Sequence, residues 1–560
     1  MNDPIQEGEI RPLSVSAPEN RAELPKYDTP APAKIKPAPS AAWVAAALLS
    51  YIPAFIYIKA QFSGYSVSRI ATPLFALLLL AGVELFCRAE HRAGNREAPF
   101  WAACWLALSI AFSLFGYQSD PLSLWQFCAW HLFAIWYILA RTGILAAGKS
   151  GSLFFLDGIA GVFLLPWPNF LARITTVFRG LAARRRAAKK VKGGTALIAV
   201  FSVLAAVAVC LVAWGELSAV DAHFAAIGGD FREWLDRTLW NNQFFVNNLV
   251  YFLLSLPVGA WLFGLVAGCL RRSAPPVSAA RFYGAISPLR RLPGLTVYLV
   301  VGALCAVYAL FFGLQTLEFF SAMGRTVGTL TAPDAAAFAV DGFWELCRIM
   351  LLNFAVLAAI YFFGTVPLRE SKAQKALAAL FCLFGIAFAG LAIAKLLTYI
   401  RLYGYTPRRV ASGWFLCVLA VWAVLAFVWV FKAIPAARIG VLTLALSFTL
   451  LCCADPNARI VEGNLARYTS GQDAAPDVNV LSQCGVTYGP RAGAQTQRLI
   501  DSGWFNGRTA ADISDLYYGI SSDPGYVVNG AAELPLYQSG SKLVLTFRQK
   551  VCVSAAVQKQ

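Results

Sequence analysis

The sequence predicts an all-α polytopic membrane helical bundle with a small α+β C-terminal extramembrane region. Of its 560 residues, 58% are hydrophobic and only 14% are charged, whereas a soluble domain carries about 25% charged residues. The apolar residues gather in long blocks, each near the ~20 residues that a helix needs to cross a bilayer. From about residue 454 onward the composition changes, and basic and acidic residues balance at 9 each.

The first 40 residues are polar and rich in proline, and they end in TPAPAKIKPAPS. Such a segment cannot bury enough apolar surface to form a core. We therefore expect residues 1–40 to be a disordered tail. The first apolar block begins too late for a secretory signal peptide.

Residues 41–453 form the predicted transmembrane domain, with about 11 spans and a range of 10–12. A twelfth span is possible at residues 151–170, although Asp157 and the two prolines near its end favour an interfacial or re-entrant piece there. The eleven apolar blocks lie at about 42–59, 71–87, 100–117, 123–143, 195–214, 246–270, 295–320, 345–364, 376–398, 412–431 and 436–453.

The distribution of Lys and Arg predicts how these helices are oriented. With the N-terminus inside, 28 basic residues lie in the inner tail and loops and 8 in the outer loops. Cytoplasmic loops carry the excess of positive charge. We expect a protein of the bacterial cytoplasmic membrane, with its N-terminus inside and, for eleven spans, its C-terminal region (454–560) outside.

An amphipathic helix is predicted on the cytoplasmic membrane surface within the interfacial segment 151–192. Its apolar face would carry Leu171, Ile174, Phe178 and Leu181, which recur at helical spacing. The basic residues that accompany this face favour anionic membrane lipids as partners. These residues are Arg179, Arg184, Arg185, Arg186, Lys189, Lys190 and Lys192.

Several chemistries are not supported by the sequence. The net charge of +17 is concentrated in short loops, and no nucleic-acid-binding motif accompanies it, so we expect no nucleic acid partner. No metal or cofactor is expected either, because the three histidines are not paired at metal-ligand spacing and no CxxC pair occurs. His131 lies inside a predicted span, where an ionisable group is a functional candidate or a helix-to-helix hydrogen-bonding group.

Residues 143–150 (GILAAGKS) match the phosphate-binding pattern GxxxxGK[ST]. That chemistry requires a strand, a loop whose amides surround the phosphate, and a helix. Here Gly143 follows a predicted membrane helix instead. We interpret the match as coincidental.

The most distinctive segment is KLLTYIRLYGYTPRR, residues 395–409. Gly404 is suited to end one helix, and Thr406 to cap the next, with Pro407 at its first position. Arg408 and Arg409 then fall in the first turn of the new helix, where the helix dipole disfavours cations. An anion at this helix start would explain both arginines.

The candidate anion-binding residues are Arg401, Tyr403, Thr406, Arg408 and Arg409. The anion would be a lipid phosphate, an anionic substrate, or a carboxylate of the protein itself. In the last case the arginines would be structural. The carboxylates considered are Asp334, Asp341, Glu345 and Asp455.

The C-terminal region is long enough for one small α+β module. Helices are predicted from Asp455 to Tyr468, from Gln497 to Ser502 and from Ala510 to Tyr517, and one strand from Lys542 to Val553. If this region lies outside, Cys484 and Cys552 could form a disulfide.

Several separated motifs follow one another in the second half of the chain: Asp341-Gly-Phe-Trp-Glu345-Leu346, Asn353, Arg401, Tyr403-Gly-Tyr-Thr406, Arg408, Asp455-Pro-Asn-Ala458 and Asn464-Leu-Ala-Arg467-Tyr468. In the order and spacing of these motifs, the chain from about residue 280 to 500 resembles a family of bacterial integral membrane proteins, of the domain-of-unknown-function 4153/4173 type. The resemblance implies a supporting role for Glu345, Asn353, Asp455, Asn464, Arg467 and Tyr468. It implies no particular activity.

Three functions are compatible with these features. The favoured one is a non-enzymatic protein that binds or moves an anionic or lipid-like ligand at the Arg-rich helix break, since broken helices often form transporter sites. The second is a membrane enzyme acting on a lipid-linked substrate, which needs an acid, base or nucleophile near the arginines. The third is an envelope sensor or scaffold. The sequence does not specify an oligomeric state.

Overall fold

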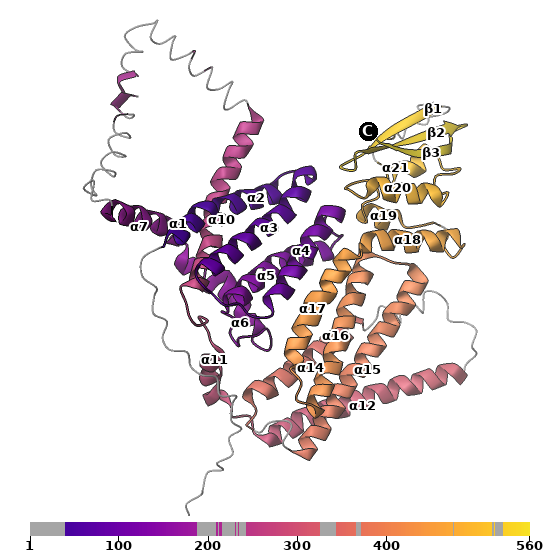
Figure 1. The fold of residues 1–560 in the computed structure, drawn as a ribbon. Coiled ribbons are helices and arrows are strands. Elements are labelled where there is room, and N and C mark those ends of the chain that lie inside the picture. The colour runs from indigo at the N-terminus through magenta and orange to yellow at the C-terminus, as the bar shows by residue number, and fades with distance from the viewer. Residues whose placement is uncertain are drawn as a thin grey trace, which may run out of the picture.

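A computed structural model of the chain describes residues 40–187, 242–324, 343–365, 371–473, 475–517, 520 and 530–559, and a few single positions between 206 and 233. This part of the chain forms a bundle of long apolar helices with a small mixed module at one end, near the C-terminus (Figure 1). The fold class predicted from the sequence is therefore confirmed.

Ten helical segments in the described ranges are long and apolar enough to cross a membrane, or eleven if one bent pair is a span. They coincide with ten of the eleven predicted blocks. The eleventh, 195–214, lies largely outside the described residues. The helices are α1 (Ala41–Leu49) and α2 (Tyr51–Phe62), which form one span, α3 (Tyr65–Ala89), α4 (Ala98–Phe115), α5 (Leu122–Thr142), α10 (Gln243–Leu270), α12 (Gly294–Gly324), α14 (Phe343–Phe363), α15 (Lys372–Tyr403), α16 (Pro407–Phe431) and α17 (Ala436–Cys453).

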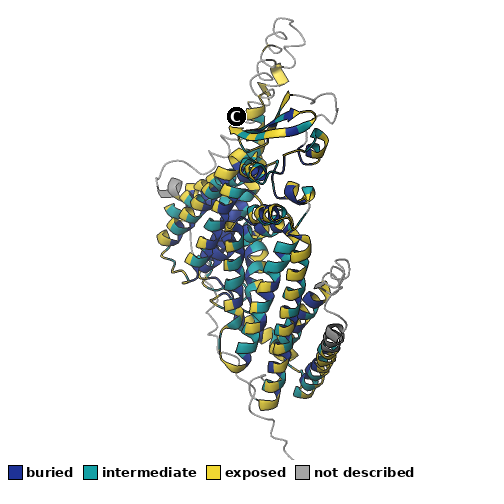
Figure 2. Ribbon diagram, turned by 90° about the vertical axis from the view of Figure 1, so that its right-hand side faces the viewer, coloured by how far each residue is buried: buried dark blue, intermediate teal, exposed yellow. Residues whose placement is uncertain are grey.

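The membrane helices pack around two apolar cores. The first joins α1–α5, α10 and α17, and its largest fully buried side chains include Trp101 and Trp105. The second joins α12, α14, α15 and α16 around Phe381 and Phe388. Figure 2 shows buried positions inside the bundle and exposed ones along its outer helix faces. Many exposed positions are Leu, Ile, Val or Phe, as expected of surfaces that face lipid tails.

The segment predicted to be interfacial is bent. It consists of α6 (Phe154–Ile159), a π-helical turn (Ala160–Leu164), a 3₁₀ turn (Trp167–Asn169) and α7 (Ala172–Ala187). The two halves meet at 41°. The predicted apolar face of α7 is exposed at Leu171, Ile174, Phe178 and Leu181, which fits a helix lying on a membrane surface.

A short helix, α11 (Ala279–Ile286), connects the two groups of membrane helices. Its residues Ala279 and Tyr283 pack with Ala146 and Leu153 in a small separate cluster. The α5–α6 loop thus contacts the connection between the two groups.

The described residues of the C-terminal module form four helices and a three-stranded antiparallel sheet in the order β1-β2-β3. Its elements are α18 (Pro456–Thr469), α19 (Val478–Gln483), α20 (Ala492–Asp501), α21 (Ala510–Ser514), β1 (Gly530–Leu536), β2 (Ser541–Arg548) and β3 (Val551–Lys559). The single strand predicted from Lys542 to Val553 is wrong. Gln549 and Lys550 both adopt positive φ and turn the chain between β2 and β3.

The module has its own apolar core, which includes Trp504, Phe505 and Phe547. Cys484 and Cys552 lie in this core as separate free thiols, so the disulfide considered from the sequence is not formed. Burial raises the pKa of the Cys484 thiol to about 12 and also raises that of Cys552. Both side chains act as small buried hydrophobic groups.

Candidate anion-binding site at the helix break

The chain turns sharply between α15 and α16. α15 ends at Tyr403, and Gly404 follows with φ of 71°. Thr406 caps α16, since its hydroxyl oxygen accepts a hydrogen bond from the Arg409 amide at 3.3 Å, and Pro407 occupies the first turn. The local reading of the sequence is correct here, because each of these features depends only on neighbouring residues.

Arg409 folds back onto the end of α15. Its Nη1 donates to the carbonyl oxygens of Tyr403 at 2.7 Å and Gly404 at 2.6 Å, and its guanidinium lies 4.3 Å from the centre of the Tyr399 ring. The last carbonyls of a helix lack partners within the helix and favour a cation nearby. Arg409 therefore stabilises the end of α15, which accounts for a cation in the first turn of α16 without an external anion.

α18 of the module holds the break from the other side. The Asn464 side chain accepts from the Tyr405 amide and donates to the Tyr405 carbonyl, both at 2.8 Å. This double hydrogen bond satisfies both backbone groups of a residue that belongs to neither helix. The Tyr405 ring lies against Gly463, where a Cβ atom would meet it at 2.8 Å.

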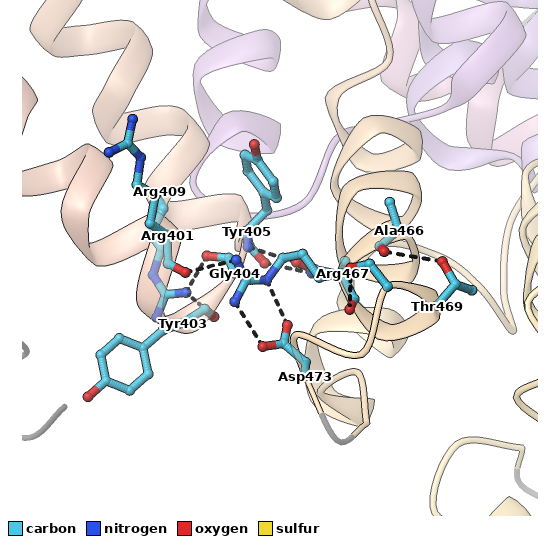
Figure 3. A network of polar contacts seen from close by, with 11 residues as sticks. Arg401, Tyr403, Gly404, Tyr405, Arg409, Ala466, Arg467, Thr469 and Asp473 are labelled. Carbon is cyan, nitrogen blue, oxygen red and sulfur yellow. Dashed lines mark hydrogen bonds and ion pairs between the residues drawn. The ribbon is translucent and has the colours of Figure 1, made fainter.

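Arg467 provides a second link from α18 to the break (Figure 3). It donates to the Arg401 carbonyl at 2.8 Å and forms two contacts with the Asp473 carboxylate, at 2.7 and 2.8 Å. Hydrogen bonding to Asp473 raises the pKa of Arg467. A bidentate pair of this kind fixes the guanidinium plane. All the contacts of Arg467 described here therefore serve the joint between the module and the bundle.

The side chains of Arg401 and Arg408 are exposed on either side of the break. Neither forms a hydrogen bond or ion pair with any residue that the structure describes. Tyr403 and Tyr405 are exposed by 45% and 39%. The five predicted site residues thus divide: Thr406 and Arg409 build the turn, and Arg401, Tyr403 and Arg408 present side chains to the outside.

Asp455 does not pair with the arginines of the break. It precedes α18 with φ of 49° and pairs with Arg491, with a distance of 2.7 Å between Oδ1 and Nε. Both side chains are buried. Asn457 lies beside them: with its amide nitrogen donating to Ser119 Oγ at 3.0 Å, its oxygen faces Arg491 Nη1 at 3.1 Å.

This second joint attaches the module to the α4–α5 loop. Arg491 also reaches the Tyr117 carbonyl at 3.5 Å, and Ser119 Oγ donates to the Gln483 carbonyl at 2.5 Å. Neither Arg491 nor Ser119 is predicted from the sequence as a functional or structural contact. No local signal was available, because Ser119 and Asn457 are separated by 338 residues.

Three of the supporting residues lie apart from the break. Asn353 is buried between membrane helices and accepts from the Tyr308 hydroxyl at 2.7 Å. It lies 3.8 Å from a Cβ placed on Gly385, about 28 Å along α15 from Gly404. Glu345 is exposed and pairs only loosely with Arg348, at 3.8 Å. Tyr468 packs against the module core. Asp334 and Asp341 lie outside the described residues.

In the loop that matches the phosphate-binding pattern, backbone amides already donate hydrogen bonds to carboxylates of the protein. The amide of Ala146 donates to Asp157 at 2.7 Å, and that of Ser150 donates to Glu97 at 2.9 Å. Glu97 is also paired with Arg438 at 2.6 Å. No strand precedes this loop, which follows α5. These amides therefore stabilise packing at the end of the bundle opposite the module.

A family described as domain of unknown function (DUF4153) matches residues 102–488, which include all residues of the helix break and, of the two joints of the module, every residue named above except Arg491. No curated protein and no solved structure matches the chain. Since the match extends over more than half of the sequence, this multi-pass membrane protein belongs to the family described as domain of unknown function (DUF4153).

Proposed function

We propose that this protein binds an anionic, lipid-like ligand at the α15–α16 break through Arg401 and Arg408. One observation carries the proposal: these two guanidinium groups are exposed, while the neighbouring Arg409 and Arg467 are fully engaged in holding the turn. The backbone of the break is therefore already held in place, and the side chains of Arg401 and Arg408 remain available to bind a ligand.

The position of the break favours a phosphate at the level of lipid head groups. The candidate spans Lys372–Tyr403 and Pro407–Phe431 end and begin there. Exposed tyrosines such as Tyr403 and Tyr405 are common where a membrane meets water. Arg is suited to phosphate because its planar guanidinium forms two parallel hydrogen bonds to it.

Binding is favoured over catalysis on a lipid-linked substrate. An enzyme would need a free acid or base close to the bound head group. Asp455 and Asp473, the acids contributed by the module near the break, are each held by an arginine. Their carboxylates are used to attach the module.

The proposal is tested by replacing both exposed arginines. We expect the variant Arg401→Ala/Arg408→Ala, purified in detergent, to retain several-fold less phosphatidylglycerol than the unaltered protein in native mass spectrometry. Its thermal stability should change little, because exposed substitutions that break no contact shift the free energy of unfolding by about 0.5 kcal/mol or less.

Arg459→Ala is the matched control. Arg459 is an exposed arginine of α18 that pairs with Glu462, one turn away. It removes a similar charge from the same end of the molecule and should leave lipid retention unchanged. Unaltered phosphatidylglycerol retention in the double variant, together with a lower melting temperature, would show that the arginines are structural.

A further inference from the structure

A separate cavity lies within the first group of membrane helices. Its volume is about 270 Å³, and it is partly open in the described part of the chain. Helices α2, α3, α5 and α10 contribute its walls. The lining residues are Tyr57, Phe75, Leu79, Trp130, His131, Ala134, Ile135, Ile138, Val258, Trp261, Leu262 and Leu265.

The cavity has one polar edge, formed by His131 and Tyr57. His131 Nδ1 is 2.8 Å from the Phe127 carbonyl oxygen, and Nε2 is 2.9 Å from the Tyr57 hydroxyl. A carbonyl can only accept, so Nδ1 carries a proton. In the neutral imidazole Nε2 then accepts the Tyr57 proton. The Tyr57 oxygen retains lone pairs and can accept a further hydrogen bond.

Of the two tryptophans in the lining, Trp130 already uses its indole N–H in a hydrogen bond. Trp130 Nε1 donates to Ser109 Oγ at 2.7 Å. The remaining lining residues are predominantly aliphatic or aromatic. A fitting ligand is therefore an apolar chain or ring with one hydrogen-bond donor, placed to meet the Tyr57 oxygen.

The location excludes a charged group on the ligand. His131 is near the middle of the candidate span Leu122–Thr142, where a charge is expensive to bury. The half-buried lining residues Tyr57, His131, Val258 and Trp261 come from α2, α5 and α10. At the depth of His131 in its span, an opening between these helices would face lipid chains.

The volume of the cavity limits how much of a ligand can enter it. An apolar cavity of about 150 Å³ in another protein stays dry and accepts benzene. This cavity is larger, so it has room for a ring or several methylene groups but not for a whole lipid. The rest of a long chain would extend through the opening into the bilayer.

We propose that this cavity binds a neutral lipid alcohol, with its hydroxyl donating to Tyr57 and its adjoining chain among Phe75, Leu79 and Trp261. The site is independent of the Arg401 and Arg408 site, since it takes an uncharged ligand and lies within the helices rather than at their ends.

The test uses the full chain in nanodiscs and a photoactivatable probe, a hexadecanol that carries a diazirine near its hydroxyl end. A hexadecane with the same diazirine is the comparison probe. Adducts are located by peptide mass spectrometry. We expect the alcohol to label the lining segments of α5 and α10, and to do so more than the alkane.

Two variants and one control sharpen the test. Tyr57→Phe keeps the ring but removes the acceptor, so the preference for the alcohol should fall by about two- to tenfold, the worth of one hydrogen bond. Ala134→Phe fills the cavity and should abolish labelling. Leu124→Phe, at an exposed position of the same helix, should change nothing.

The proposal is overturned if both probes label only exposed helix faces, or if cavity labelling by the alcohol is the same in Tyr57→Phe. It is also overturned if residues 195–214 cover the cavity and exclude both probes. Should Ala134→Phe fail to fold, the adduct map of the unaltered chain and the Tyr57→Phe comparison still decide.

Discussion

Glycine at position 404 is required for two separate reasons. Its φ of 71° lies in the region that side chains rarely adopt. A Cβ atom at this position would also come within 2.7 Å of Asn464 Oδ1, which is the atom that accepts from the Tyr405 amide. A larger residue would therefore strain the turn and displace the side chain that holds it.

We expect Gly404→Ala to lower the free energy of unfolding by about 1–3 kcal/mol, because both backbone strain and a lost buried contact contribute. The measurement is thermal unfolding of the purified protein in detergent. Gly390→Ala is the control on the same helix, since nothing lies within 4 Å of a Cβ there. Equal melting temperatures for the two variants would contradict the role given to Gly404.

At the scale of single residues, the sequence predicts those features of the break that depend only on adjacent residues. The Thr406 cap and the end of α15 at Gly404 follow from short-range backbone chemistry. The partner of Arg409 is not predicted correctly. The dipole of α16 favours an anion beside Arg409, but its guanidinium instead binds carbonyl oxygens at the end of α15. Asn464, which holds the Tyr405 backbone by two hydrogen bonds, lies 59 residues further along the chain. No local sequence pattern predicts this contact.

At the scale of elements, α18 connects the module to two different parts of the membrane domain. Its N-terminal side carries Asn457, which contacts Ser119 of the α4–α5 loop, and its C-terminal side carries Asn464 and Arg467, which contact the α15–α16 break. Beside Asn457, the Asp455–Arg491 pair links the start of α18 to the start of α20 within the module. Breaking a buried ion pair by removing one partner is costly because it leaves an uncompensated buried charge. The Asp455–Arg491 pair is therefore expected to secure the module.

We expect Asp455→Ala to lower the free energy of unfolding by about 3–5 kcal/mol, because the buried Arg491 is left without its carboxylate. The double variant Asp455→Ala/Arg491→Leu should recover part of this loss, since it removes both charges. The measurement is a double-mutant cycle on thermal unfolding, followed by the protease sensitivity of the α17–α18 junction. Additive effects of the single changes would show that the two side chains are not coupled.

At the scale of the whole molecule, hydropathy alone located the membrane helices, because a span must be apolar over its whole length. The module was harder to predict from the sequence. Its strands are short, and the turn at Gln549 and Lys550 contains neither glycine nor proline. The sequence pattern therefore predicts one strand from Lys542 to Val553, across β2 and the first residues of β3. The sheet forms through pairing between segments and packing against α20, which pattern along one segment does not reveal.

The structure also fixes which loops share a face of the bundle. Ser119 contacts Asn457 and Tyr405 contacts Asn464, so the α4–α5 loop, the α15–α16 break and the module lie together. Glu97 and Arg438 meet at the other end. The bias of basic residues toward the second face predicts that it is cytoplasmic.

We expect alkaline phosphatase to be active when fused after Gln560 or inserted after Ser119 in a bacterial host, because the enzyme needs the oxidising compartment outside the cytoplasm. An insertion after Lys432, on the opposite face, should be inactive with phosphatase and fluorescent with a cytoplasmic fluorescent protein. The reverse pattern at all three sites would invert the orientation without changing the fold. Phosphatase activity at only one of Gln560 and Ser119 would contradict the contact between the module and the α4–α5 loop, because one membrane face cannot be both inside and outside.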